Sequence, residues 1–304
     1  MTDDAVAPVV AAMLILAIGV TFFAAWNAYY VPSMKAQSEI THIKDVETGF
    51  LRFSSDIESA ASLKRSMQLS ELIPLGGGEF TFDPVKSGGS LMIQNDTYGY
   101  MRIIINGTNA TPAINFLHLS NYSYQPVNNF WQDQGYVWSY GYVNVTKDTL
   151  STPLQSTNMS DVDYGLTGAL FSLETVPWPD DPTQCSQINV YSVNITPEAG
   201  YTFESGNGNG LLVLNSSIMT QQFTNVTNLT ISVNHNLPDG FQSAIWNNVN
   251  ESANALNESA NGGIPICRNI VVYQSSSRTI QLLFDPIPNM TLNRKITEIS
   301  LGAN

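Results

Sequence analysis

One uncharged segment near the start of the chain limits what the chain can fold into more than any other feature. Residues 5–31 contain no Asp, Glu, Lys, Arg or His. As a helix these residues would extend for about 40 Å, which is enough to cross a hydrocarbon core of about 30 Å. Trp26, Tyr29 and Tyr30 lie at the far end, where an interfacial aromatic belt is expected. The segment therefore predicts a single transmembrane helix, and Pro32 predicts a kink or break after it.

The first residues of this segment carry a recognisable motif. The opening DDAVAPVVAAMLILAIGV is similar to the start of archaeal type IV pilin-like proteins, in which Asp-Ala-Val-Ser-Pro-Val-Val/Ile-Gly precedes an apolar helix. Ala7 and Ala11 replace the usual Ser and Gly, and no basic residue precedes the motif. Residues 31–60 also resemble archaeal pilin-like surface proteins with long β-rich C-terminal regions, so the resemblance covers about the first third of the chain.

This resemblance implies a subunit that membrane lipid holds before assembly and that then polymerises with copies of itself through the N-terminal helices. It also implies cleavage by a prepilin peptidase between Asp4 and Ala5. A filament core of this kind requires helices that carry no charged side chains and leave no backbone groups unpaired. The uncharged segment meets that requirement.

Beyond Pro32, apolar residues recur at alternating steps of three and four. The spacing predicts a helix with one apolar stripe, ending near Leu72, before Pro74 and the glycines at 76–78. The stripe could pack on the chain's own head or on helices of other copies, and we expect both. Gly49 is expected to be a flexible point, because glycine weakens a helix interior. The stripe consists of Ile43, Val46, Phe50, Phe53, Ile57, Ala60 and Met67.

From Glu79 onward the apolar pattern changes to a period of two, which predicts short strands separated by polar turns. The expected fold class is α+β, with a long N-terminal helix followed by a mainly antiparallel β-sandwich or barrel head. Residues 135–146 are expected to form one strand and residues 269–286 a hairpin. The expected organisation is a leader (1–4), a helical stem (5–72), a β-rich subdomain (75–180) and a second β-rich part with one helix near 240–260 (181–304).

The predicted helix near 240–260 rests on Phe241, Ile245 and Val249, which recur at helical spacing after the candidate cap Asp239. We expect this helix to cover a sheet edge or face. The boundary between the two β-rich parts is placed in the proline-rich segment 176–185.

Sites of the Asn-x-Ser/Thr type are more frequent in this chain than chance predicts. The chain contains 29 Asn, and about five such sites would be expected from its composition. N-glycosylation by an oligosaccharyltransferase would place the head outside the cell, whereas the alternative is an Asn- and Thr-rich surface without sugar. The sites are Asn95, Asn106, Asn109, Asn121, Asn144, Asn158, Asn194, Asn215, Asn225, Asn228, Asn250, Asn257 and Asn289.

The cysteines and the charge also bear on location and partners. An exported head would allow a disulfide between Cys185 and Cys267, and the alternative is two buried thiols. The net charge of −13 argues against nucleic acid or anionic lipid as a partner of the head, because like charges repel.

We identify no catalytic, cofactor-binding or metal-binding motif in the sequence. His42, His118 and His235 are widely separated. Acidic pairs at 161/163 and 180/181 lack the spacing of a calcium loop.

Three functions are compatible with these patterns. They are a pilin-like filament subunit with no enzymatic activity, a solitary membrane-tethered adhesin or envelope glycoprotein, and a tethered carbohydrate-active enzyme. The last would need paired carboxylates beside an aromatic residue such as Trp131, Trp138 or Trp178.

Overall fold

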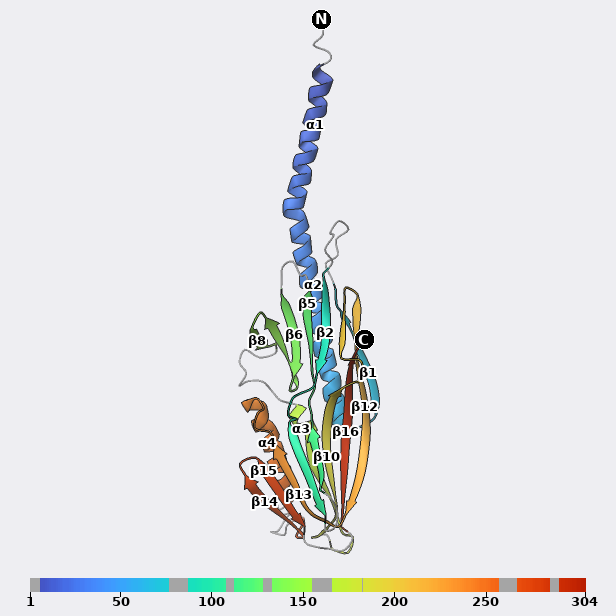
Figure 1. Cartoon of the computed structure of the whole chain (residues 1–304), viewed down its shortest axis with the longest axis vertical. Coiled ribbons are helices and arrows are strands. Elements are labelled where there is room, and N and C mark those ends of the chain that lie inside the picture. Colours follow the sequence, from blue (N-terminus) through green and yellow to red (C-terminus); the bar gives the residue numbers. More distant parts are fainter. Residues whose placement is uncertain are drawn as a thin grey trace.

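The computed structural model places a long helical stem ahead of a β-rich head, and the N-terminus lies far from the head (Figure 1). The model describes residues 6–76, 87–107, 112–127, 133–154, 166–181, 183–256, 267–284 and 290–304. The fold class is α+β, as the sequence predicts.

The stem is one continuous helix made of α1 (Val6–Ala25), a π-helical turn η1 (Trp26–Tyr30) and α2 (Val31–Leu63). The break predicted at Pro32 is absent from this described stretch. Proline has no N–H to donate, and its ring would clash with the carbonyl four residues earlier in a regular α-helix. The wider π-turn, in which the Val31 N–H donates to the Trp26 carbonyl, lies just before Pro32 and accommodates the proline without ending the helix.

The predicted end of the stem near Leu72 is wrong, because α2 ends at Leu63. Lys64 then adopts a left-handed conformation with φ of 47°, which terminates the helix. Met67, assigned to the helical stripe from its spacing, instead begins β1 (Met67–Pro74). Residues 67–74 pair along their whole length with β12 (Asn209–Thr224), and these ladder hydrogen bonds replace the ones that a longer helix would make.

The head contains three sheets, and all strand pairs are antiparallel in the described parts except β10 with β16. The first has the order β1, β12, β16 (Thr291–Ala303), β10 (Cys185–Pro197) and β9 (Phe171–Pro177). The second has the order β11 (Phe203–Gly206), β2 (Gly88–Gln94), β5 (Asn121–Val127), β6 (Gln134–Ser139), β7 (Tyr142–Lys147) and β8 (Leu150–Pro153). The third has the order β14 (Ile270–Ser276), β15 (Thr279–Phe284), β13 (Val226–Val233), β3 (Met101–Gly107) and β4 (Ala113–Leu117).

Strand pairing does not divide the head near residue 180. Each sheet contains strands from both sides of that position, as in the pairs β1–β12 and β3–β13. The proline-rich segment 176–185 connects β9 to its hairpin partner β10, so it is a loop within one sheet. Residues 135–146 are likewise two strands, because Tyr140 and Gly141 both have positive φ and reverse the chain.

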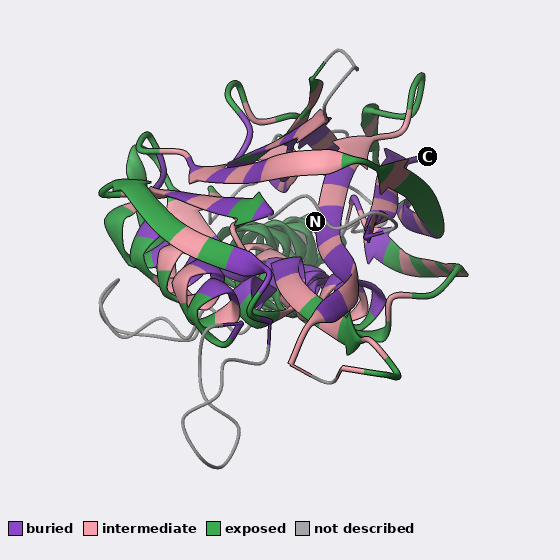
Figure 2. Ribbon diagram, turned by 90° about the horizontal axis from the view of Figure 1, so that it is seen from below, coloured by how far each residue is buried: buried purple, intermediate pink, exposed green. Residues whose placement is uncertain are grey.

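The remaining helices are α3 (Leu166–Leu170) and α4 (Asp239–Asn254). The predicted helix near 240–260 is thus present, although its N-cap is Pro238 rather than Asp239. The buried apolar residues of α4 belong to the core of the head, and Asn248 Nδ2 donates to the carbonyls of Thr167 and Phe171 at 2.8 and 2.9 Å. Buried and more accessible residues alternate along strands such as β2 and β3 (Figure 2), as the period of two requires.

Candidate functional site on the stem helix

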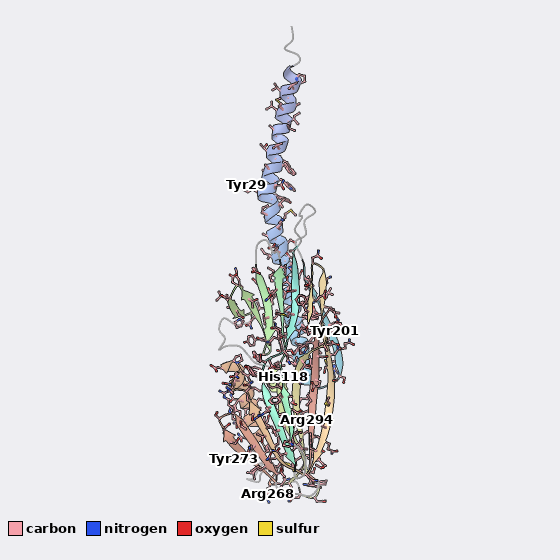
Figure 3. The ribbon with its side chains drawn as sticks, in the orientation of Figure 1. Tyr29, His118, Tyr201, Arg268, Tyr273 and Arg294 are labelled. Carbon is pink, nitrogen blue, oxygen red and sulfur yellow. A yellow bond between two sulfur atoms is a disulfide. The ribbon has the colours of Figure 1, made fainter. Side chains whose placement is uncertain are left out.

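The free part of the stem presents apolar side chains on all sides. Every residue from Pro8 to Tyr30 is exposed, including the consecutive Ile15 and Leu16 at 73% and 70%. Tyr29, labelled in Figure 3, projects from the same part of the stem. The helix Pro8–Leu63 is long and apolar enough at its N-terminal end to cross a membrane, by length and composition. An apolar surface of this extent favours lipid or other helices over water.

The character of the stem changes where it enters the head. Glu39 and His42 are the first buried residues, and the His42 ring lies 2.9 Å (Nε2 to O) from the Pro74 carbonyl. Beyond this point the outward face of α2 carries exposed polar residues such as Lys44, Thr48 and Arg52. An apolar contact between stems is therefore restricted to α1, η1 and the first turns of α2.

The apolar stripe of α2 is buried in the chain's own head. Ile43, Val46, Phe50, Phe53, Ile57 and Ala60 all belong to the core. Packing of the stripe on the head is thus observed, and these side chains are not available to helices of other copies. Gly49 also has a different role from the one expected. A Cβ at Gly49 would lie 2.5 Å from Ile73 Cδ1, so glycine allows β1 to approach the helix closely.

Four aromatic side chains on β5 and β6, which we call the aromatic cradle, hold α2 in place. The cradle consists of Tyr122, Tyr124, Tyr136 and Trp138. Tyr122 Oη donates to the Phe50 carbonyl at 3.1 Å, and Trp138 Nε1 donates to Ser54 Oγ at 3.0 Å. The Tyr122 and Trp138 rings stack with centroids 5.3 Å apart. These contacts add directional hydrogen bonds to the apolar contact between helix and sheet.

Burial changes the acid–base behaviour of the cradle. Desolvation raises the pKa of Tyr122 well above its ordinary value. Desolvation and then the nearby Glu47 carboxylate raise the pKa of Tyr136, whose Oη lies 3.1 Å from Glu47 Oε2. The sequence analysis did not identify the cradle. Its signal is an aromatic residue at every second position, at 122 and 124 and again at 136 and 138.

A disulfide joins Cys185 at the start of β10 to Cys267, with Cα atoms 5.2 Å apart. Asn269 supports this connection, because its side-chain amide both donates to the Cys185 carbonyl and accepts from the Cys185 N–H, each at 2.9 Å. The disulfide therefore ties the segment that follows α4 to the first sheet.

The candidate glycosylation sites differ in accessibility. Asn95 and Asn225 are exposed, whereas Asn144 is buried. Asn194 Nδ2 already donates to Glu298 Oε2 at 2.7 Å. The half-buried sites are Asn106, Asn121, Asn194, Asn215, Asn228 and Asn250. The sites Asn109, Asn158, Asn257 and Asn289, and the predicted cleavage position between Asp4 and Ala5, lie outside the described residues.

The other candidate chemical groups have separate local partners or are exposed. His118 Nδ1 is 2.5 Å from Asp96 Oδ1, and His235 is exposed on the turn after β13. The Asp181 carboxylate accepts hydrogen bonds from Thr183 and Gln184 in its own turn, and these bonds lower its pKa. In the described ranges, no three His, Cys, Asp or Glu side chains are grouped so as to hold a metal ion.

The tryptophans considered for an enzyme site do not form one shared site in the described structure. Trp138 lies in the aromatic cradle and is buried, whereas Trp178 is half-buried in the loop between β9 and β10. Trp131 lies outside the described residues, as do the acidic residues at 161 and 163. Comparison of the chain with protein-family models, with curated proteins and with solved structures finds no match.

Proposed function

We propose that this chain is a type IV pilin-like subunit of an extracellular archaeal surface filament. The observation that carries this proposal is the projecting α1 helix, which is uncharged from Val6 to Ala25 and apolar on every side. The resemblance of its sequence to the archaeal pilin N-terminal motif supports the same conclusion. In this proposal membrane lipid surrounds α1 before assembly, and α1 helices of other copies surround it afterwards.

Assembly would be driven by apolar burial between stems. Fully burying one Leu, Ile or Phe side chain contributes about 1.5–3 kcal/mol, and α1 carries many such residues. A head-to-tail contact between identical subunits does not close on itself, so it extends into a filament. The polar outward face of α2 limits the contact to the projecting part of the stem. The head would then face outward, with glycans at accessible sites such as Asn95 and Asn225.

A second function, a solitary membrane-tethered adhesin or envelope glycoprotein, is favoured by one specific observation. The apolar stripe of α2 is buried against the chain's own head. A monomeric tether requires nothing more than this arrangement and an anchor in lipid.

Thiol crosslinking on cells distinguishes the two functions, because both natural cysteines are in the disulfide. Single cysteines are introduced on different sides of α1, as in Leu14→Cys, Leu16→Cys and Phe22→Cys. Thr48→Cys, on the polar face of α2, is the matched control. A bismaleimide, which joins two single-cysteine subunits, should give a dimer-sized product from at least one α1 variant and none from the control, with filaments visible by electron microscopy. Monomer-sized products from every variant would support the tether.

A further inference from the structure

The head contains a pocket that has no part in stem assembly. Its volume is about 330 Å³, and it opens where β3 begins and β13 ends, at one end of these neighbouring strands of the third sheet. We propose that this pocket binds an acidic sugar, one that carries a carboxylate on its ring, within an external polysaccharide. The inference concerns the head alone and holds for either proposed function.

The binding groups come from neighbouring strands of the third sheet. Arg102 on β3 lies directly opposite Phe116 on β4 and opposite Ser232 on β13. Residues in register on adjacent strands point to the same face of a sheet, so these three side chains form one row across the pocket. Tyr98 and His235 also line the pocket.

The pocket wall is held by hydrogen bonds that do not use the side chains of Arg102, Phe116 or Tyr98. Asn234 Nδ2 donates to the Gly99 carbonyl at 2.7 Å, and Asn234 Oδ1 accepts from the Asn236 N–H at 3.0 Å. Gly99 has a φ of +70°, and a Cβ there would lie 2.7 Å from the Leu117 carbonyl, so only glycine fits this turn. Gly99 also lies against His118, which is labelled in Figure 3. The loops that carry Tyr98 and His235 are therefore fixed to each other before any ligand arrives, which lowers the entropic cost of binding.

Two aromatic side chains indicate the shape of the ligand. Tyr98 and Phe116 are 66% and 54% exposed, although aromatic side chains of this size are usually buried. A sugar ring offers an apolar C–H face that can cover an aromatic ring and hydroxyl groups at its edge that can bond polar groups. A pocket of about 330 Å³ is at the small end of the range for ligand sites, which suits one or two sugar rings.

Arg102 indicates the charge of the ligand. It is exposed and forms no ion pair with any described residue, in a chain whose net charge is −13. A guanidinium group binds a carboxylate through two parallel hydrogen bonds, which a neutral sugar cannot form. The strong negative charge of the whole chain disfavours non-specific binding of anions, so recognition of an acidic sugar depends on this local cation.

Calorimetry on the full chain in detergent micelles tests the inference, with oligogalacturonate as the probe. A maltooligosaccharide of the same length tests the need for the carboxylate, and an oligoglutamate of the same length tests the need for the ring. We expect oligogalacturonate to bind at least about tenfold more tightly than either. Arg102→Gln and Tyr98→Ala should each weaken that binding by about tenfold. Arg65→Gln, which removes an exposed arginine outside the pocket lining, should leave it within about twofold.

Equal losses from Arg102→Gln and Arg65→Gln would overturn the inference, because binding would then depend on overall charge. If oligoglutamate binds as tightly as oligogalacturonate, the ligand of the pocket is an acidic peptide and not an acidic sugar, and the inference is overturned. Thermal unfolding should occur at the same temperature in all three variants, since the substituted side chains are exposed. Stem crosslinking should also be unchanged in Arg102→Gln, so failure of the sugar site leaves the proposed filament function untouched.

Discussion

The hydroxyl group of Tyr122 on β5 donates a hydrogen bond to the main-chain carbonyl of Phe50 on α2, at 3.1 Å. The two rings are also in contact, with centroids 5.0 Å apart. One side chain thus binds both the backbone and the apolar face of the stem. Because Phe50 and Tyr122 are far apart in sequence, this contact fixes how the helix sits in the head.

Tyr122→Phe should lower the free energy of unfolding by about 1 kcal/mol, because it removes the hydrogen bond and keeps the ring. Trp138→Phe should cost more, since it removes both the bond to Ser54 and part of the buried volume. Urea unfolding of the full chain in detergent measures both effects. Tyr98→Phe, at an exposed tyrosine, is the control and should have no effect.

Alkaline pH should destabilise the head through the cradle tyrosines. Their folded pKa values are raised by burial, whereas in the unfolded chain they ionise near the ordinary value of 10.0. The folded state therefore keeps these protons to a higher pH, so the contribution of these tyrosines to stability is constant below about pH 10 and falls as pH rises above it. A Tyr122→Phe/Tyr136→Phe double variant should show a shallower decline in stability against pH. An unchanged slope would mean that other groups govern alkaline unfolding.

Gly49 and Ile73 should be energetically coupled, because a Cβ on residue 49 would lie 2.5 Å from Ile73 Cδ1. Gly49→Ala alone gains about 1 kcal/mol of helix propensity but must displace the Ile73 side chain. Ile73→Val alone should cost about 1 kcal/mol, since it removes a buried methyl group. In the double variant the new methyl group occupies the vacated space. The free energy of unfolding of the double variant should therefore be at least about 0.5 kcal/mol higher than the value obtained by adding the effects of the two single changes. Simple additivity in a double-mutant cycle would contradict the close contact.

The disulfide should stabilise the head chiefly around α4. Replacing both Cys185 and Cys267 by alanine should lower the free energy of unfolding by about 2–4 kcal/mol. Amide hydrogen exchange should accelerate most in α4 and β14, which flank Cys267 in sequence. Exchange in α2 should change little, since the cradle holds it independently. A uniform increase across the head would argue against this local role.

Removing the projecting helix should change solubility without changing the fold of the head. A chain that begins at Val31 keeps the whole of α2 and loses α1, none of whose described side chains is buried. We expect this chain to remain in the aqueous fraction without detergent and to unfold at the same urea concentration as the full chain. A large drop in that midpoint would show that α1 also supports the head.

The elements with strong local patterns could be predicted from the sequence. The apolar periods of α2, α4 and β15 agree with their burial, and α1 is predicted from its continuous uncharged apolar run. The end of the stem could not be predicted, because Met67 satisfies both the helical period and the alternation of β1. Its strand partner Ser216 is remote in the chain, and that pairing decides the outcome.

The aromatic cradle and the pocket depend on which strands become neighbours. Alternating aromatics at Tyr122 and Tyr124 fit a solvated sheet face as well as a buried one until α2 is seen to pack on them. Arg102 and Phe116 come together only through the register of β3 with β4. Sequence periodicity indicates which side of a strand a residue occupies, but it does not identify the residue across from it.

The way α2 lies in the head determines how the molecule would respond to a pulling force. The helix runs along the long axis of the head, beside β12 and β16 (Figure 1). Tension applied at the N-terminus would act along the interface between α2 and the sheets, so the bonds from Tyr122, Tyr136 and Trp138 would be strained together. Bonds loaded in parallel share the force, whereas bonds loaded in series break one at a time. The buried half of the stem is therefore suited to transmit mechanical load from the projecting half to the head without being extracted.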